Sequence, residues 1–168
     1  VVCFDPFPSV ARYVARNRLR VAVLLDHTRA VAPMLPCPSI PYTYVRDDDV
    51  KAGGLKQKFD VILYGQTGLA LGEQMHGIDP KFGALAYTRT PEYPSHGVPD
   101  ASDDITGGIG WVGMASVQRF LDEGGVLMTL GNGSALPLEG GLVRGVSAAP
   151  GAGSVWTPGV ELTASFTR

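Results

Sequence analysis

Three short runs of apolar residues constrain the fold of this chain more than any other feature of its sequence. Each run is rich in valine, leucine and isoleucine and shows no strict alternation with polar residues, which is typical of a strand buried on both faces of a parallel sheet. Each also stops at an aspartate or a glycine, where a loop would begin. We therefore predict three parallel strands at residues 19–25, 59–64 and 125–130, followed by Asp26, Gly65 and Gly131, with the first strand central.

Shorter patterns complete an alternating order of strands and helices. Residues 42–45 predict a fourth strand, and residues 47–52 predict a helical turn with acidic residues at its start and Gly53 past its end. Residues 109–123 predict the longest helix, whose apolar face consists of Ile109, Val112, Val117, Phe120 and Leu121. Because this helix leads through Gly124-Gly125 directly into a strand, a right-handed crossover would place it against the sheet. An α/β sheet with helices on both faces follows.

Two stretches do not fit this alternation. Residues 65–108 separate a strand from a helix with little periodicity, and we expect them to fold over the carboxyl edge of the sheet. Residues 143–146 and 160–166 alternate between apolar and polar side chains, which predicts half-buried strands.

Composition narrows the class of protein. The 168 residues suit one domain, and 14 basic against 16 acidic residues leave no positive field to attract nucleic acid. No apolar run is long enough to span a membrane. Cys3 and Cys37 are either bridged or two inert thiols, and their spacing fits neither a redox nor a zinc motif. Because the chain begins with Val1 rather than Met, we expect a processed or truncated polypeptide.

The turn after the last predicted strand lies where α/β hydrolases present a nucleophile. Such an elbow needs Ser or Cys two residues after a glycine, but Gly133 stands there and Ser134 is one step out of register. We expect a turn in which Asn132 and Gly133 take left-handed conformations and Ser134 caps the next segment. The alternative is a hydrolase that uses Ser134 with His96.

Other polar groups carry weaker chemistry. His27, His76 and His96 have no metal-ligand spacing, and solvated loop positions are the simplest interpretation, although His27 follows Asp26 at a strand end. Residues 106–110 could offer amides to an anion, but a tight turn before the helix explains them as well. The acidic run 47–49 is interpreted as a solvated helix start rather than a calcium site.

Several of these segments together carry a resemblance to a known family. Residues 41–55, 59–62, 106–111 and 124–132, in this order and spacing, resemble the class I glutamine amidotransferase-like domain appended to bacterial zinc carboxypeptidases of the carboxypeptidase A family. The resemblance covers residues 19–166. It departs from the family between the first strand and Pro41, where four prolines disfavour the usual helix.

The resemblance implies a flavodoxin-like three-layer sandwich with a mainly parallel sheet, in a secreted or cell-envelope peptidase. Zinc would be bound by a peptidase domain that these residues do not include, and that domain of the same polypeptide would be the partner. The family of true amidotransferases has a Cys at the position of Gly133 and a later His, whereas no histidine follows His96 here. The resemblance therefore implies a pseudoenzyme domain without glutaminase activity.

We accordingly expect residues 1–18 to be an N-terminal segment or linker and residues 19–168 to be the domain, truncated at its C-terminal end. The expected function is that of a non-catalytic accessory or binding domain, with no catalytic residue and no metal of its own. A small ligand or peptide would bind at the carboxyl edge. The candidate ligand-binding residues are Asp26, His27, Gln66, Gly107, Gly108, Asn132 and Gly133. A small serine hydrolase and a stand-alone ligand-binding module are the alternatives.

Overall fold

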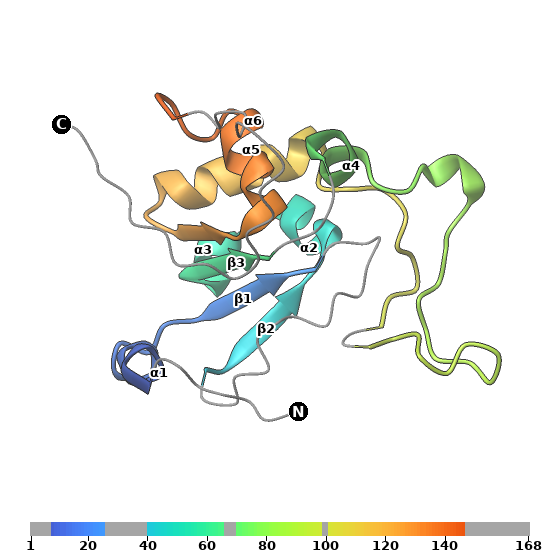
Figure 1. Cartoon of the computed structure of the whole chain (residues 1–168), viewed down its shortest axis with the longest axis horizontal. Helices are drawn as coiled ribbons and strands as arrows, with labels where there is room; N and C mark the ends of the chain where they lie inside the picture. Colours follow the sequence, from blue (N-terminus) through green and yellow to red (C-terminus); the bar gives the residue numbers. More distant parts are fainter. Residues whose placement is uncertain (1–7, 26–39, 66–69, 99–100, 147–168) are drawn as a thin grey trace, which may run out of the picture.

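A four-stranded parallel sheet forms the centre of the protein. The structure is a computed structural model that describes residues 8–25, 40–65, 70–98 and 101–146. The strands are β1 (Val21–Leu24), β2 (Tyr42–Val45), β3 (Val61–Tyr64) and β4 (Val126–Thr129), in the order β2-β1-β3-β4 (Figure 1). All four lie within the runs that the sequence predicts, and β1 is central as expected. The α/β class is thereby confirmed.

The strand register brings all four carboxyl ends to the same edge of the sheet. Leu24 pairs with Val45 on one side and with Tyr64 on the other, and Tyr64 pairs with Thr129. The residues that follow each strand consequently share this edge, which we call the carboxyl edge.

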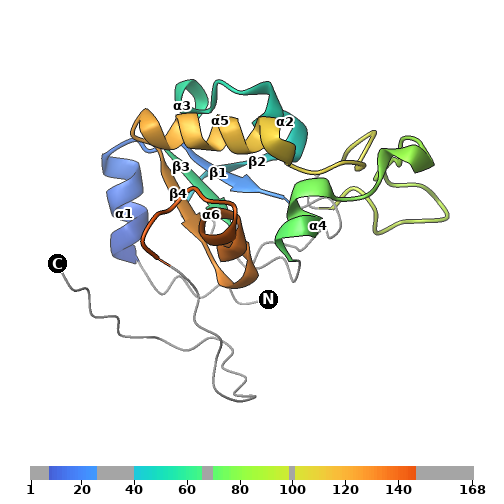
Figure 2. The ribbon, with the colours of Figure 1, turned by 90° about the horizontal axis from the view of Figure 1, so that it is seen from above.

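A layer of three helices covers one face of the sheet (Figure 2). It consists of α2 (Asp47–Ala52), α3 (Leu55–Lys58) and α5 (Gly110–Asp122). Two short helices, α4 (Leu71–His76) and α6 (Ala135–Glu139), contact each other near the carboxyl edge, and η2 (Gly131–Ser134) joins β4 to α6. At the opposite end of the strands lies α1 (Pro8–Arg16), within the segment that the sequence analysis takes as a linker (Figure 1). No helix among the described residues is both long and apolar enough to cross a membrane.

The main core lies between the sheet and this helix layer. Alternate strand residues point into it, because successive side chains of a strand face opposite sides. Phe120 of α5 is almost fully buried, and Gly125 comes so close to its ring that a side chain at that position would collide with it. The buried core residues are Ala22, Leu24, Val45, Val50, Leu55, Ile62, Tyr64, Met75, Ile109, Met114, Val117, Phe120 and Leu136.

The buried face of α5 agrees with the predicted one at Ile109, Val117, Phe120 and Leu121 and differs at one position. Val112 was expected in the core, but it is 64% exposed, whereas Met114 is buried. Met114 reaches the turn after α6, where its methyl group lies next to Gly140. Because α5 contacts α2, α3 and α4 as well as β4, its buried surface is wider than a single face against the sheet.

The fourth strand also differs from expectation. The run 125–130 predicts a strand buried on both faces, but Val126, Met128 and Leu130 are about half exposed. β4 lies at the edge of the described sheet, where the face opposite to α5 is less covered. Local composition could not reveal this, since an edge strand and a central strand of a parallel sheet can have the same residues.

Only part of the long connection 65–108 lies over the carboxyl edge. α4 does, but residues 78–98 and 101–107, which we call the arm, extend away from the sheet (Figures 1 and 2). The Gly107 amide donates a 2.6 Å hydrogen bond to the Ile78 carbonyl and closes the base of the arm. Within the arm, the Asp104 carboxylate accepts hydrogen bonds from the amides of Leu85 and Thr106. The arm therefore satisfies part of its backbone by itself, without the sheet.

The predicted strand at 143–146 is wrong. These residues form bends, and the Val143 amide donates to the Pro137 carbonyl. Gly141 and Gly145 both have positive φ, which an extended strand does not accommodate. The second alternating segment, 160–166, lies outside the described residues, as do Cys3 and Cys37.

An ion-pair cluster joins β1 and β3 at their amino ends. The Asp60 carboxylate accepts two hydrogen bonds from the Arg20 guanidinium, at 3.0 and 2.8 Å, and one from Lys56 Nζ at 3.0 Å. The Arg20 amide donates to the same carboxylate. These hydrogen bonds, led by those from Arg20, hold the pKa of Asp60 far below its ordinary value of 3.8.

Candidate functional site

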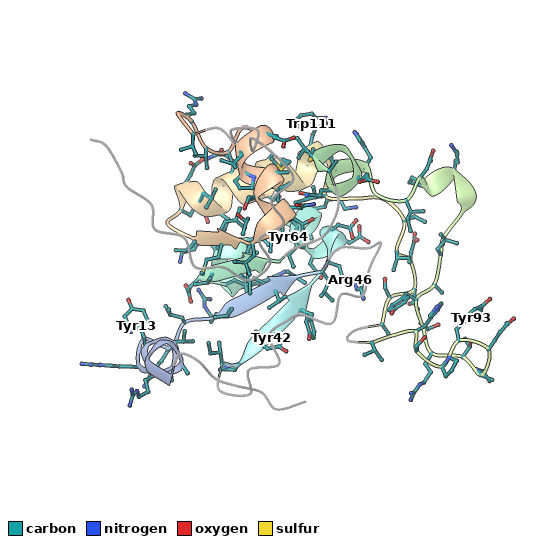
Figure 3. The ribbon with its side chains drawn as sticks, in the orientation of Figure 1. Tyr13, Tyr42, Arg46, Tyr64, Tyr93 and Trp111 are labelled. Carbon is teal, nitrogen blue, oxygen red and sulfur yellow. The ribbon has the colours of Figure 1, made fainter. Side chains whose placement is uncertain are left out.

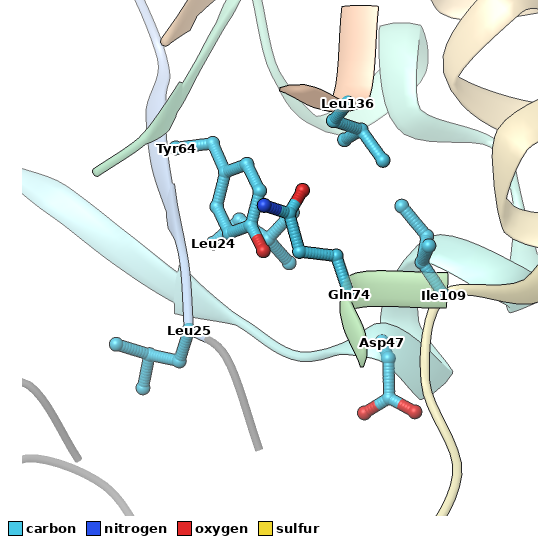
Figure 4. A pocket seen from close by; sticks show the side chains of 7 residues that line it. All are labelled: Leu24, Leu25, Asp47, Tyr64, Gln74, Ile109 and Leu136. Atoms are coloured by element: carbon cyan, nitrogen blue, oxygen red, sulfur yellow. The ribbon is translucent and has the colours of Figure 1, made fainter. Parts of the chain in front are cut away.

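A small cavity lies at the carboxyl edge, where β1 and β3 end (Figure 4). The described residues enclose about 20 Å³, which is room for one or two water molecules. Its walls are mostly aliphatic, with one carboxylate, one amide and one phenol. The lining residues are Leu24, Leu25, Asp47, Tyr64, Gln74, Ile109 and Leu136.

The strand order explains why a cavity forms at this place. β2 and β3 follow β1 in sequence but lie on opposite sides of it. The chain therefore leaves β1 in one direction and returns on the other side, so that the connections above β1 and β3 diverge. Open α/β sheets bind ligands in the crevice that such a reversal of strand order creates.

Asp47 supplies the carboxylate. It is the first residue of α2, two positions after β2, and only 8% of its surface is exposed. Its Oδ2 accepts a 3.0 Å hydrogen bond from Lys51 Nζ, which also pairs with Asp48 at 2.7 Å. Although partial burial opposes the charged form, the hydrogen bonds to Asp48 and Asp47 raise the pKa of Lys51 above its ordinary value. A charged lysine consequently accompanies the buried carboxylate.

Gln74 supplies the amide. Gln74 is 3% exposed, and its side chain lines the cavity together with that of Tyr64 (Figure 4). Gln74 Nε2 donates a 2.9 Å hydrogen bond to the Asn132 carbonyl, and the Gln74 carbonyl accepts one from the Ile109 amide. This one residue therefore connects α4 to the turn after β4 and to the start of α5.

Gly133 belongs to this turn, and the neighbouring backbone of Tyr64 and Gly65 leaves no room for a side chain on it. A Cβ added there would lie 2.5 Å from the Gly65 carbonyl oxygen and 2.9 Å from that of Tyr64. Real Cβ atoms essentially never approach an oxygen so closely, so the elbow position can hold only glycine in this backbone. The missing nucleophile is thus a requirement of the packing between β3 and the turn.

The conformation of the turn differs from the predicted one. The left-handed residue is Gly131, with φ of 53°, rather than Asn132 or Gly133. Ser134 has right-handed helical angles and makes no capping hydrogen bond. Its hydroxyl lies 3.0 Å from Thr129 Oγ1, and the two exchange a hydrogen bond. A 3₁₀ turn satisfies the backbone here, which removes the need for a cap.

Ser134 and His96 are not brought together. His96 lies in the arm, stacked between the rings of Tyr87 and Tyr93 at centroid distances of 4.9 and 4.8 Å. Figure 3 shows Tyr93 far from Tyr64, at whose carbonyl the Ser134 turn begins. His76 ends α4 with an exposed side chain, and the Asp79 carboxylate binds Lys81 rather than a histidine. Asp26, His27 and Gln66 lie outside the described residues.

Gly107 and Gly108 lie beside the cavity and serve close packing. A Cβ at Gly107 would be 3.7 Å from Lys51 Nζ, and one at Gly108 would be 2.7 Å from the Met75 carbonyl oxygen. The Gly107 amide already donates to Ile78. These contacts favour the tight-turn interpretation of residues 106–110.

The interpretation of residues 47–49 as solvated is correct for two of the three. Asp48 and Asp49 are exposed, and Asp49 accepts a hydrogen bond from the Arg46 amide. Asp47 is buried instead, because it begins α2 at the carboxyl edge and faces the base of α5. Its place two positions after a predicted strand was a signal in the sequence that could have identified it, in the same way that Asp26 is a candidate because it follows the first strand.

The described lining of the cavity contains one carboxylate, one amide and one phenol among aliphatic side chains. No serine, cysteine or histidine lines the described walls of the cavity. Nor do the described residues contain a group of three or more His, Cys, Asp or Glu side chains placed to hold a metal ion. What they offer is a carboxylate with its lysine, an amide and a phenol next to aliphatic surface. Comparison of the chain with family models, curated proteins and solved structures found no match.

Proposed function

We propose that this chain is a non-catalytic accessory or binding domain whose carboxyl edge holds a small polar ligand or the end of a peptide. The observation that carries the proposal is the cavity at the ends of β1 and β3, which the buried residues Asp47 and Gln74 line together with Leu24, Ile109 and Leu136. Small-molecule sites combine apolar walls with a few placed polar groups, which is the composition of the lining of this cavity.

The strand order supports a finer fold class. β2-β1-β3-β4 corresponds to the first four positions of the 2-1-3-4-5 order of flavodoxin-like sheets, which bind their ligand above β1 and β3. We therefore propose a flavodoxin-like three-layer sandwich. This order also agrees with the resemblance to the amidotransferase-like domain of zinc carboxypeptidases. In that context, zinc and proteolysis belong to a peptidase domain of the same secreted or envelope polypeptide.

The geometry of the described residues lends no support to the serine-hydrolase alternative. The Ser134 hydroxyl is engaged with Thr129, and His96 is held between two tyrosines of the arm. A general base must come within hydrogen-bond reach of its nucleophile. Labelling of Ser134 in the folded protein by a fluorophosphonate probe would revive this alternative.

The lining residues indicate the kind of ligand. Asp47 accepts hydrogen bonds, Gln74 both donates and accepts them, and the aliphatic walls suit a short hydrocarbon group. Because the cavity has room for only one or two water molecules, only an end group of the ligand can enter it, and an amino acid, an amino-acid amide or a dipeptide has an end group of this kind. A mononucleotide would need a phosphate site, and the buried carboxylate of Asp47 disfavours one near the cavity.

The test is a thermal-shift screen of the full chain with amino acids, amino-acid amides, dipeptides and flavin mononucleotide. A ligand that binds the native state at 100 times its Kd raises the unfolding free energy by about 2.7 kcal/mol, so a true ligand gives a clear increase in Tm. Asp47→Asn should abolish the shift. The matched control is Asp48→Asn, which changes the same charge at an exposed position of α2 and should keep the shift.

Two results would contradict the proposal. One is a panel without any shift, and the other is an equal loss of binding in both variants, which would reflect the charge of α2 rather than the cavity. The accessory role has its own test in the mass of the native polypeptide. A native chain of peptidase size that contains an HxxE motif supports the accessory role. A native chain that begins near Val1 and ends near Arg168 favours a stand-alone binding module.

A further inference from the structure

A second cavity lies on the helix layer, between α3 and the C-terminal half of α5. The two helices lie side by side there (Figure 2), and the cavity has about 110 Å³, against about 20 Å³ at the carboxyl edge. At about 15 Å³ for one water molecule, this is room for roughly seven waters or for a small ligand. We call it the helix-layer cavity. Its lining residues are Gly54, Leu55, Lys56, Gln57, Ser116, Arg119, Phe120 and Glu123.

Small residues explain why the chain does not fill this space. Gly53 and Gly54 join α2 to α3. Ser116 of α5 lies opposite this link, since a Cβ added to Gly53 would be 3.6 Å from Ser116 Oγ. Ser116 is buried and lines the cavity, so its hydroxyl is placed to hydrogen-bond to a ligand. Leu55 and Phe120 are almost fully buried and make the inner wall apolar.

Two opposite charges lie at the outer part of the lining. Arg119 and Glu123 are exposed and one helical turn apart, a spacing that allows an ion pair. Neither side chain takes part in an ion pair among the described residues. Lys56, the other charge of the lining, already pairs with Asp60 at 3.0 Å. One guanidinium and one carboxylate are therefore left for a ligand.

We propose that the helix-layer cavity binds a free α-amino acid with a short side chain. The Arg119 guanidinium binds the carboxylate of the ligand, and the Glu123 carboxylate binds its ammonium group, so that each charge of the zwitterion meets its opposite. The short side chain contacts the apolar inner wall. A simple anion has no group for Glu123, and a simple cation has none for Arg119. The two cavities share no lining residue, so this proposal does not rest on the function proposed for the carboxyl edge.

Titration of the full chain with L-alanine, followed by NMR of the isotope-labelled protein, tests the proposal. The signals of the Gly54 amide and of Arg119 Nε–H should shift and saturate with a Kd on the order of 1 mM, because exposed ion pairs bind weakly. Acetate and ethylammonium each carry one of the two charges and should bind about tenfold more weakly. Arg119→Gln and Glu123→Gln should each lower the affinity for L-alanine by about the same factor.

Asp122→Asn is the matched control for Glu123→Gln. It removes the same charge one position away, on a side chain that accepts a hydrogen bond from Gln118 and does not line the cavity. The affinity for L-alanine should stay unchanged. Because Arg119, Asp122 and Glu123 are all exposed, we expect the three variants to fold.

Three results would overturn the proposal. The first is the absence of saturable shifts at Gly54 and Arg119. The second is that acetate binds as tightly as L-alanine, which would mean a simple anion contact at the arginine. The third is an equal loss of affinity in Asp122→Asn, which would reflect the overall charge of α5.

The same titration keeps this site apart from the carboxyl edge. Asp47→Asn, which removes the carboxylate of the other cavity, should leave the shifts at Gly54 and Arg119 unchanged. Shifts confined to the carboxyl edge would overturn the amino-acid site on the helix layer and leave the function proposed for the carboxyl edge intact.

Discussion

Polar and charged side chains lie next to apolar strands at both ends of the sheet, but their burial and their partners differ between the two ends. At the amino end, Asp60 is bound by Arg20 and Lys56 in a partly exposed cluster where each charge has its partner. At the carboxyl end, Asp47 and Gln74 are buried and line a cavity. Charge pairs shared with water cost little and stabilise modestly, whereas buried polar groups cost more and must be held in place by the fold. The amino end is therefore closed by ion pairs, whereas the carboxyl end contains a small cavity.

The largest expected effect lies at the carboxyl end, in Gly133→Ala. The new Cβ would collide with the carbonyl oxygens of Gly65 and Tyr64, so the turn after β4 must move. We expect a loss of about 2–3 kcal/mol in the free energy of unfolding, measured by urea denaturation. Gly65→Ala is the control on the same edge, because nothing lies within 4 Å of its added Cβ. Equal effects of both variants would show that the turn is more adaptable than its packing indicates.

The lysines of the two ends give the most direct comparison. Lys51 and Lys56 are similarly exposed, at 30% and 28% of their side chains. Lys51→Met leaves the buried Asp47 without its lysine, and we expect it to cost about 1–2 kcal/mol. Lys56→Met should cost about 0.5 kcal/mol or less, because Asp60 keeps Arg20. Chemical denaturation of both variants in parallel measures the difference, and the reverse order would contradict the contrast between the two ends.

Asp60→Asn probes the amino end itself. The amide keeps the shape of the side chain but loses the charge that Arg20 and Lys56 bind, and we expect a loss of about 1 kcal/mol after screening by water. Asp79→Asn, at the fully exposed pair with Lys81, should have a smaller effect. Thermal melting of the two variants at neutral pH measures the difference as a change in Tm. An unchanged Tm in Asp60→Asn would mean that the cluster does not contribute to stability.

Acid should weaken the same cluster. The pKa of Asp60 is held well below its ordinary value of 3.8 in the folded chain, mainly by the Arg20 hydrogen bonds. Below pH 4 the unfolded chain takes up a proton at this residue and the folded chain does not, so the stabilisation present at higher pH falls steadily as pH drops. Denaturation between pH 6 and pH 2.5 measures the free energy of unfolding as a function of pH. This free energy should fall less steeply with decreasing pH in Asp60→Asn than in the unaltered protein. The same pH dependence of the unfolding free energy in both proteins would contradict a stabilising role of the Asp60 ion pairs.

The smallest effect is expected in the arm, which belongs to neither end. His96→Ala removes the ring between Tyr87 and Tyr93, and we expect a global change of about 0.5 kcal/mol or less, because the stack does not touch the main core. The Tyr87 amide, which donates to Ser102, should exchange faster. His96→Phe should restore its protection by restacking. A large global loss would mean that the arm supports the cavity at its base.

The sequence predicted what depends on local pattern. All four strands, α2 and the extent of α5 follow from apolar runs, an acidic first turn and terminal glycines, because these features act over a few residues. Other features depend instead on which elements pack against each other. They are the presence of Met114 rather than Val112 in the core, the exposure of Val126 and the burial of Asp47. No periodicity contains that information.

The candidate site was predicted by place more than by residue. The predicted residues and the cavity both lie at the carboxyl edge, and the Asn132 carbonyl accepts a hydrogen bond from the Gln74 side chain beside the cavity. Gln74 itself was missed because α4 is only six residues long and has no apolar period. Gly133 was singled out for a missing side chain, and the reason for its absence, the close carbonyl of Gly65, is visible only when β3 and the turn after β4 lie side by side.

The parallel sheet also determines when its last strand, β4, can pair during synthesis of the chain. Val61 pairs with Val126, 65 positions later, so β4 cannot join the sheet until the arm and α5 have been synthesised. Pairings this distant in sequence are associated with slow folding. The cost of closing the intervening loop nevertheless grows only logarithmically, by about 0.6 kcal/mol for each doubling of its length. The roughly 30 residues of the arm therefore delay the pairing of β4 with β3 during synthesis, but their cost to the stability of the folded sheet is small.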